Sequence, residues 1–257
     1  MYKTYDKTIT KAEIDTIMQP KLAKLYKSIE PVSTTTLPDA IEFKILKVLC
    51  VNPFMDYTTL FKVMTRETKI DSKKLKSKIE ILCDKQLIQF KQCVNSSNHR
   101  PSNYFPLESK AYDLLNYPKA RRVEARFFKH SFYIEKVSEH IESQGYKALT
   151  EYTPANHPYP AERIDVAFYD KDNCLIAFEI TLSTDSLISN IKKCVSMNAK
   201  NIIIVVELPK YIPSIQTTVE NTILSSQILS RISYEPVATF IPKKTKKRKE
   251  VKNVLRR

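Results

Sequence analysis

Glycine is almost absent from this 257-residue sequence: it occurs once, at position 145, and tryptophan does not occur at all. Loops that hold nucleotide phosphates on backbone amides need clustered glycines, so a P-loop and a dinucleotide-binding turn are excluded. No apolar run approaches the roughly 20 residues that a helix needs to span a bilayer. The opening residues, MYKTYDKTIT, lack the apolar stretch of a secretory signal. These absences favour a cytoplasmic protein.

Clustered metal ligands are also lacking. The five cysteines stand at positions 50, 83, 93, 174 and 194 without any CxxC pair. A zinc site is not expected on this spacing. Most of these cysteines lie in apolar segments, which predicts buried, reduced thiols of the kind usual in the cytosol. His130, His140 and His157 show no ligand spacing either, and we expect surface or packing roles for them.

Positive charge is what the sequence has in excess. The formal net charge is +14, and the last fifteen residues, KKTKKRKEVKNVLRR, hold nine Lys and Arg against one Glu. Such a tail is expected to be disordered and to bind a polyanion, with DNA as the leading candidate. An anionic membrane surface is the alternative, but no amphipathic anchor supports it. The tail residues predicted to contact DNA are Lys243, Lys244, Lys246, Lys247 and Arg248.

Hydrophobic residues make up 42% of the chain, enough for a packed core. We find no internal repeat and predict four parts. A helical extension covers 1–37, two folded domains cover 38–117 and 118–242, and the basic tail covers 243–257. The overall fold class expected is α+β, with an α/β second domain.

The 38–117 segment predicts three helices followed by a hairpin and a short helix. Apolar residues recur at helical spacing in 39–52, 56–67 and 71–88. The third helix has Asp71 or Ser72 as its N-cap and buries Leu75, Ile79 and Leu82. Strand patterns at 87–94 and 103–108 flank the turn-rich NSSNHRPS. This order resembles a winged-helix domain.

The resemblance implies that the third helix enters the DNA major groove while the hairpin tip touches the backbone. No Arg, Asn or Gln cluster suited to reading bases stands out on that helix, so we expect phosphate contacts to outweigh base readout. Solubilising lysines and a winged helix that binds protein are the alternatives. The residues predicted to contact DNA are Lys73, Lys74, Lys76, Lys78 and Arg100.

The 118–242 segment predicts a mixed sheet flanked by helices. A long helix ends at Gly145, and three strands follow at 146–152, 163–170 and 174–183. A helix with Leu187, Ile191, Cys194 and Val195 inward comes next, then the continuously apolar strand AKNIIIVVELP, typical of a sheet centre. A helix at 212–232 and a last strand at 235–241 complete the order.

Two carboxylates stand out on the predicted hairpin of this sheet. Asp165 opens one strand, and Glu179 lies inside the apolar strand that follows. Pairing would bring both to one edge of the sheet, where they would repel each other unless a cation lay between them. Hard oxygen ligands suit Mg²⁺ or Mn²⁺. Such an ion can activate water to cleave a phosphodiester.

The stretch from Arg121 to Val206 resembles the core of the PD-(D/E)XK nuclease superfamily. Asp165 matches the first acidic motif, with Ile164 where the family often has proline, and Glu179 matches the second. Thr181 stands where the family has its lysine. The resemblance implies that Lys192 or Lys193, with Lys193 preferred, replaces that lysine. It also implies an assisting acid on the preceding helix, with Glu135 preferred over Glu139.

The winged helix followed by this core is similar to the replication-relaxation proteins of plasmids and other mobile elements. The resemblance implies a Mg²⁺- or Mn²⁺-dependent DNA endonuclease acting in replication, mobilisation or transposition. Its metal ligands would be Asp165 and Glu179, and its catalytic residues would also include Glu135 and Lys193. Expected partners are DNA and either a second copy of the chain or proteins of a mobile-element complex.

Three other functions remain open on these residues. The first is a non-catalytic DNA-binding factor that uses an inactive nuclease fold, and Thr181 favours it. The second is a nuclease subunit that is active only in a transposon or defence complex. The third is a protein-interaction module. Simpler roles stand beside each acid as well. Asp165 would pair with Arg163 at the surface, Glu179 would pair with a lysine and do nothing else, and Glu135 would lie on a solvated helix face.

Overall fold

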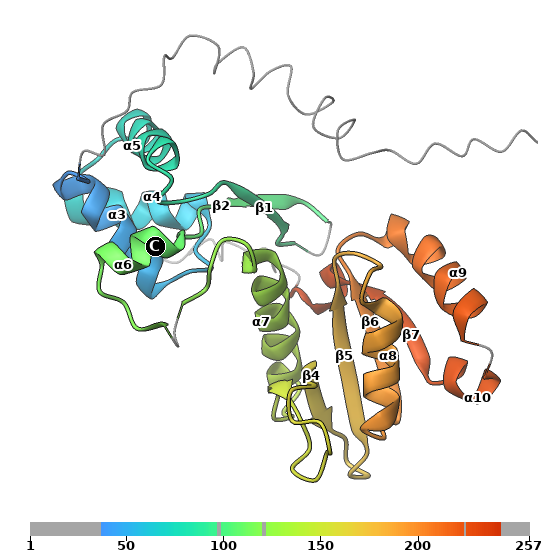
Figure 1. Ribbon diagram of the computed structural model, residues 1–257. Helices are drawn as coiled ribbons and strands as arrows, with labels where there is room; N and C mark the ends of the chain where they lie inside the picture. The colour runs from blue at the N-terminus through green and yellow to red at the C-terminus, as the bar shows by residue number, and fades with distance from the viewer. Residues whose placement is uncertain (1–36, 97–98, 120–121, 224, 243–257) are drawn as a thin grey trace, which may run out of the picture. The chain divides into compact units, whose positions relative to one another are not determined.

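The computed structural model describes residues 37–96, 99–119, 122–223 and 225–242 (Figure 1). The helical extension predicted over 1–37 and the basic tail predicted over 243–257 lie outside the described residues, except for Leu37. The described residues from Pro38 onward belong to one compact unit.

Three helices come first: α3 (Ala40–Val51), α4 (Tyr57–Thr68) and α5 (Ser72–Asp84). Each begins after an aspartate whose side chain accepts an amide N–H of the first turn, which satisfies a donor that the helix itself leaves unpaired. The N-cap of α5 is therefore Asp71 and not Ser72. Leu75, Ile79 and Leu82 are buried, as the helical spacing predicts.

A short hairpin and helix follow these helices. Strands β1 (Lys91–Val94) and β2 (Pro101–Tyr104) pair antiparallel, and α6 spans Ser109–Leu114. Both strands are shorter than predicted, and β2 lies earlier. The remaining parts of the two segments pair through an isolated bridge between Ile88 and Leu107 and are not assigned to the strands. The order of three helices and a hairpin is as expected, while the winged-helix assignment stays a resemblance.

The rest of the chain builds a five-stranded mixed sheet in the order β3-β4-β5-β6-β7. Strands β3, β4 and β5 pair antiparallel, and β5, β6 and β7 pair parallel. The predicted α+β class with a mixed sheet is confirmed, and β6 is a buried inner strand as its apolar run predicts. The strands are β3 (Leu149–Tyr152), β4 (Ile164–Tyr169), β5 (Leu175–Thr181), β6 (Asn201–Val206) and β7 (Ile232–Pro236).

Helices cover both faces of this sheet (Figure 1). Helix α7 (Phe128–Ser143) packs on one face against Ile176, Phe178 and Ile180 of β5. Helices α8 (Leu187–Ser196) and α9 (Ile212–Thr222) pack on the other, against Leu175 and Ala177. All seven residues of β5 are buried. Because side chains alternate along a strand, Glu179 and Thr181 fall on the α8 side.

In the 118–242 segment, three differences from the sequence prediction stand out. The long helix begins at Phe128 and not near 121, although Gly145 ends it as predicted with a left-handed φ of 85°. The helix predicted over 212–232 is two helices, α9 and α10 (Ser226–Leu229). The last strand lies earlier than predicted, and most of the segment expected to form it is the 3₁₀ turn η3 (Val237–Phe240).

The hairpin shares a hydrophobic core with the sheet. Tyr104 of β2 contacts the rings of Phe128 and Phe132 on α7, with the Phe132 centroid 4.9 Å away. The amide of Val94 donates to the Tyr133 hydroxyl at 3.1 Å. Residues on both sides of the boundary predicted near 117 therefore bury one another.

The five cysteines are all free thiols, and Cys50, Cys93 and Cys194 are buried as predicted. Within the described ranges, we find no helix that combines the length and apolarity needed to cross a membrane.

Candidate functional site

Three carboxylates occupy matching positions on three neighbouring strands. Thr150 and Tyr152 of β3 pair with Val166 and Ile164 of β4, which brackets Glu151 opposite Asp165. The pairing of Val166 with Phe178 places Asp165 next to Glu179 across β4 and β5. The sheet thus aligns Glu151, Asp165 and Glu179 in one row.

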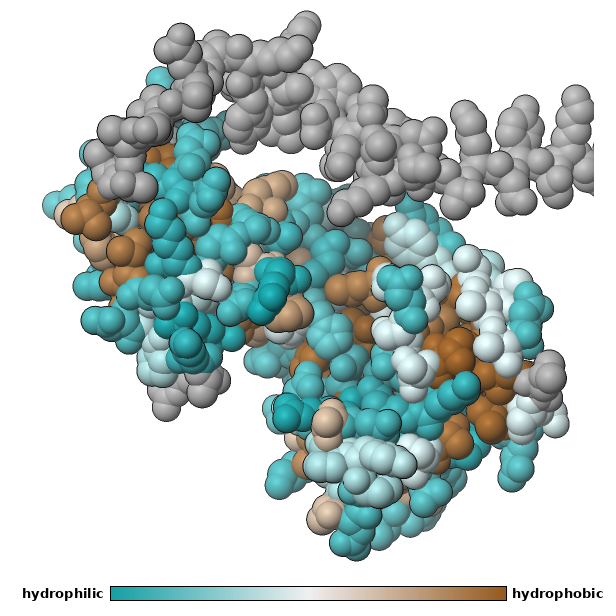
Figure 2. Space-filling view, in the orientation of Figure 1, coloured by the Kyte–Doolittle hydropathy of each residue, from teal (hydrophilic) through white to brown (hydrophobic). Residues whose placement is uncertain are grey.

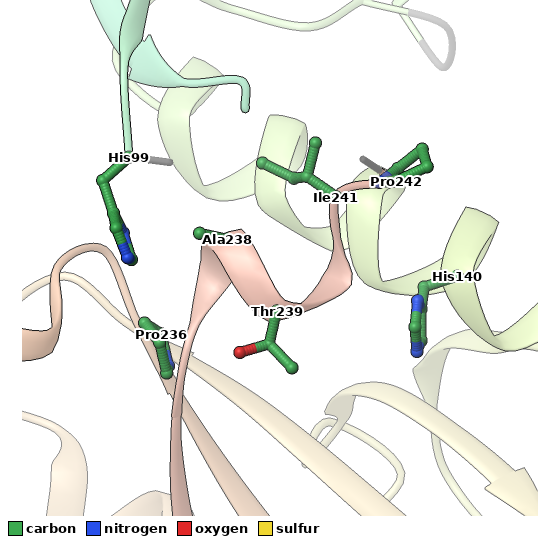
Figure 3. A pocket seen from close by; sticks show the side chains of 7 residues that line it. All are labelled: His99, His140, Pro236, Ala238, Thr239, Ile241 and Pro242. Carbon is green, nitrogen blue, oxygen red and sulfur yellow. The ribbon is translucent and has the colours of Figure 1, made fainter. Parts of the chain in front are cut away.

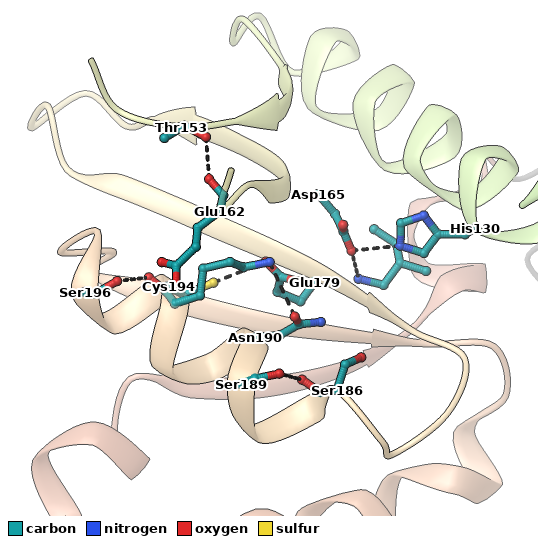
Figure 4. A network of polar contacts seen from close by, with 12 residues as sticks. His130, Thr153, Glu162, Asp165, Glu179, Ser186, Ser189, Asn190, Cys194 and Ser196 are labelled. Carbon is teal, nitrogen blue, oxygen red and sulfur yellow. Dashed lines mark hydrogen bonds and ion pairs between the residues drawn. The ribbon is translucent and has the colours of Figure 1, made fainter. Parts of the chain in front are cut away.

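Asp165 is buried at 8% exposure and lies where β4 and β5 stop pairing. Its Oδ2 accepts the amide N–H of Ile180 at 2.8 Å in place of a strand-to-strand bond. The same oxygen lies 3.1 Å from Nε2 of His130, which reaches it from α7 (Figure 4). Asp165 is therefore anchored to β5 and to α7 at once.

His130, Glu151 and Asp165 form a group able to bind a metal ion. One ligand atom from each lies within 4.8 Å of the others. An imidazole with two carboxylates suits Mn²⁺ and other divalent ions. The sequence predicts only a surface or packing role for His130, and its patterns do not single out Glu151. The sequence does contain one regularity that includes Glu151: Glu151 precedes Asp165 by fourteen residues, and Asp165 precedes Glu179 by fourteen.

Glu179 is fully buried, with 0% exposure. Its Oε1 accepts from Lys193 Nζ at 2.9 Å and from the Cys194 thiol at 3.4 Å. Its Oε2 is buried without a hydrogen-bond partner among the described residues. Burial, together with the nearby charge of Asp165, raises the pKa of Glu179 to about 7, although Lys193 opposes the shift.

The charge of His130 is favoured by its surroundings. The hydrogen bond to Asp165 raises the pKa of His130, while burial acts in the opposite direction. The carboxylates of Asp165, Glu151 and Glu179 add to the increase. All three acids in the row thus act on this imidazole, so the group is one electrostatic unit.

The other predicted catalytic residues fall in different places. Lys193, on α8, pairs with Glu179, as the simpler role for that acid predicts, whereas Lys192 is exposed. The replacement of the family lysine by Lys193 stays a prediction. Glu135 is exposed on α7 and has no hydrogen bond or ion pair within the described ranges, and the metal-binding group does not include it. Its assisting role stays a prediction. Arg163 forms no ion pair with Asp165 in the part of the chain that the structure describes.

The lysines predicted to contact DNA divide into two sets. Lys73, Lys74 and Lys76 are exposed on α5, and Arg100 is exposed beside the hairpin turn. Lys78 instead pairs with Asp39 and, at 2.9 Å, with Glu42. Its charge is matched and partly buried. Lys76 lies 4.0 Å from the exposed Glu80, a weak surface pair, so Lys73, Lys74 and Lys76 are the better candidates for phosphate contacts. The five predicted tail residues lie outside the described residues.

Glu42, the partner of Lys78, is the centre of a small cluster of charged residues. It is buried, and Lys85 reaches it at 2.6 Å in addition to Lys78. Burial acts to raise the pKa of Glu42, but the hydrogen bonds from Lys85 and Lys78 outweigh it, and the pKa is lowered. This cluster ties α3 to α5 and has a structural role.

A small hollow, here called the β5–β6 hollow, lies where the loops after β5 and β6 meet. It has a volume of about 190 Å³. A larger hollow of about 380 Å³ lies between His99, His140 and the segment 236–242 (Figure 3) and includes none of the three carboxylates. The polar residues of the β5–β6 hollow are Thr181, Ser183, Thr184, Glu207, Tyr211 and Ser214.

No protein-family model matches this chain, and no significant match was found among the curated proteins. Its residues and geometry therefore carry the functional interpretation.

Proposed function

We propose that this chain is a DNA-binding protein whose sheet domain hydrolyses phosphodiester bonds with the help of a divalent metal ion. The observation that carries the proposal is the group of His130, Glu151 and Asp165, whose ligand atoms lie within 4.8 Å of one another. Glu179 follows Asp165 on the next strand, outside that group, and pairs with Lys193. Carboxylates on neighbouring strands repel one another, and a cation relieves that repulsion.

The residues present fit a metal ion. The buried Oε2 of Glu179 lacks a partner within the described ranges, which is costly unless a ligand supplies one. Asp165, Glu151 and His130 would hold the ion, and Glu179 would contribute its free oxygen. A bound ion of this kind activates water and polarises a phosphoryl oxygen. The imidazole favours Mn²⁺ over Mg²⁺, which takes oxygen ligands almost alone.

The protein's own groups would do the positioning. Asp165 is fixed by Ile180 and His130, so its free oxygen keeps one direction. Lys193 carries a positive charge beside Glu179 and would offset the charge that develops on a phosphate. It takes the place of the lysine absent at Thr181. The exposed lysines of α5 would bring the DNA backbone to the molecule.

A non-catalytic DNA-binding factor is the second candidate. Glu179 is enclosed by Lys193 and Cys194, and an ion must displace part of that arrangement to reach Oε1. In either case we place the chain in the cytoplasm, acting on plasmid or other mobile-element DNA as a homodimer or with partner proteins. The setting rests on the resemblance to replication-relaxation proteins.

Calorimetry with Mn²⁺ and Mg²⁺ tests the metal site directly. We expect wild-type protein to bind Mn²⁺ more tightly, and the Asp165→Ala/Glu179→Ala variant to lose binding together with cleavage of supercoiled DNA. Glu139→Gln is the matched control, because this exposed acid on α7 pairs with Lys136. Glu135→Gln decides whether the helix acid assists. Metal binding without cleavage would favour the second candidate, and absence of both would refute the nuclease proposal.

A further inference from the structure

The β5–β6 hollow is on the same edge of the sheet as the carboxylate row. Thr181 borders it and follows Glu179 by two residues on the same face of β5. Ligands of open α/β sheets bind outside the carboxyl ends of the parallel strands, which is where this hollow lies. Its volume of about 190 Å³ is below the ~300 Å³ at which pockets for drug-sized ligands begin. A unit such as one sugar-phosphate fits that size.

Thr181 gives the hollow an unused hydroxyl. The residue is 6% exposed, and its Oγ1 is buried without a hydrogen-bond partner among the described residues. Buried hydroxyls are nearly always bonded, so an unbonded one that borders a hollow calls for a ligand. This is also the position where the nuclease resemblance expects a lysine.

The N-terminus of α9 and the loop that leads into α8 border the same hollow. Ser183 and Thr184 lie just before α8, and Ser214 lies in the first turn of α9. Neither helix has an N-cap side chain that accepts a hydrogen bond from it. The positive end of the α9 dipole therefore lies at a rim of hydroxyl donors, an arrangement that suits an anion such as phosphate.

Tyr211 adds an aromatic surface. Its side chain is 44% exposed, and Lys210 Nζ lies 5.1 Å from the ring centroid. An exposed ring beside a cation is a common platform for an unpaired base. Figure 2 shows the outer surface of α9 in pale colours, which mark residues of intermediate hydropathy.

Glu207 is the acid at this rim, and its charge is already matched. Lys129 Nζ lies 2.9 Å from one carboxylate oxygen and 3.1 Å from the other. The Tyr133 hydroxyl donates to Oε1 at 2.9 Å. Both partners belong to α7, so the carboxylate is bound on that side and does not exclude an anion from the hollow.

We propose that the β5–β6 hollow binds one unpaired nucleotide of a nucleic-acid strand. Its phosphate would be held by the hydroxyls of Thr181, Ser183 and Ser214, and its base would stack on Tyr211. The inference rests on the proposed function and deepens it, because it names the substrate as a strand with an unpaired nucleotide next to the carboxylate row.

Fluorescence anisotropy with a labelled oligothymidylate tests this site. The full chain is used in EDTA, which prevents cleavage, at about 0.15 M salt, where distant charges are screened. We expect Tyr211→Ala to weaken binding at least about fivefold and Tyr211→Phe to retain it, because stacking needs the ring and not the hydroxyl. Tyr169→Ala is the matched control, since Tyr169 is 40% exposed at the opposite end of β4.

Thr181→Val provides a second readout with nearly unchanged shape. Removing an unbonded buried hydroxyl should raise the melting temperature, and removing a phosphate ligand should at the same time weaken oligonucleotide binding. A rise in melting temperature with unchanged affinity would show that the hydroxyl binds nothing. Equal affinities for Tyr211→Ala, Tyr169→Ala and wild type would overturn the proposal.

The assay separates this inference from the proposed function. The binding assay contains no metal. If the wild-type protein cleaves no DNA but Tyr211→Ala still weakens oligonucleotide binding, the nucleotide site stands and the nuclease proposal fails. Normal metal binding and cleavage, with an unaffected Tyr211→Ala, would remove the nucleotide site alone. Thymidine monophosphate is the remaining probe. If it displaced the oligonucleotide at equal nucleotide concentration, the hollow would serve free nucleotides and the assignment to a strand would be wrong.

Discussion

The ion pair between Glu179 and Lys193 is poorly explained by stability alone. Removing two charges from water is expensive, and replacing a buried pair by neutral groups is often neutral or stabilising. Here one carboxylate oxygen also stays unbonded among the described residues, and burial raises the pKa of Glu179 to about 7. A group kept under such conditions is more readily explained by chemistry than by folding.

Substituting Lys193 alone should be costly. Lys193→Met leaves a buried carboxylate without its cation, and we expect a loss of about 3–5 kcal/mol in unfolding free energy at pH 8. The double variant Glu179→Gln/Lys193→Met removes both charges and should be as stable as wild type or more stable. Urea denaturation of the three proteins measures this. A double variant less stable than Lys193→Met would contradict the interpretation.

The same variants have a defined pH dependence. The pKa of Glu179 is raised on folding, so its protonated form is favoured in the folded protein. The associated stability is fully present below about pH 4.5, the ordinary pKa, and is lost as the pH rises through about 7. The Lys193→Met penalty should therefore be small at pH 5 and large at pH 8. A penalty independent of pH would contradict the assigned pKa.

Sequence alone predicted part of this site. Asp165 and Glu179 could be chosen because each is an acid in an apolar strand, whereas Lys193 followed only from the resemblance to the nuclease core. His130 could not, since only the packing of α7 on the sheet brings it to Asp165. Glu151 is exposed and belongs to a short strand, so its place in the row depends on the register of β3 and β4.

At the scale of elements, the lysines of α5 lie in two different environments. Lys73, Lys74 and Lys76 are exposed, whereas Lys78 is held by Asp39 and Glu42. Helical spacing places all four on one helix but does not tell which of them meets an acid from α3. That distinction needed the packing of the two helices.

The exposed lysines and the paired Lys78 should respond differently to mutation. Lys73→Ala/Lys74→Ala/Lys76→Ala should weaken duplex DNA binding and reduce the dependence of log affinity on log salt, by up to roughly 0.9 for each phosphate that is no longer neutralised. Lys78→Ala should lower stability and leave that slope unchanged. Filter binding over a salt series, with thermal melts, measures both. An unchanged slope in the triple variant would favour a winged helix that binds protein.

Element boundaries were harder to predict than element types. The segment 212–232 has apolar spacing typical of one helix, yet α9 ends at Thr222 and α10 begins at Ser226. The Ser225 side chain accepts the Ile228 amide and starts the new helix. β7 likewise includes Ile232, an apolar residue that helical spacing assigns to the end of the preceding helix. Local capping and pairing decided both cases.

At the scale of the whole molecule, aromatic rings join the hairpin to the sheet. Phe132 is buried on α7 and contacts Phe54, Tyr104 and Phe128. Phe54 and Tyr104 come from the segment predicted as one domain, and α7 from the segment predicted as the next. A core shared in this way couples the stability of both segments, so movements of helices α3, α4 and α5 would be transmitted to α7, which carries His130.

Phe132→Ala tests that coupling. Deleting a buried phenylalanine ring should lower the unfolding free energy by about 3–5 kcal/mol. Because the ring belongs to the shared core, amide hydrogen exchange should accelerate in α3 and in β6 alike. Leu82→Ala is the matched control, since Leu82 belongs to the separate core cluster of the 38–117 segment. If the two segments unfold as one unit, Leu82→Ala will also accelerate exchange in β6. If Phe132→Ala and Leu82→Ala each accelerate exchange in α3 but not in β6, the two segments are independent domains, as the boundary near 117 predicts.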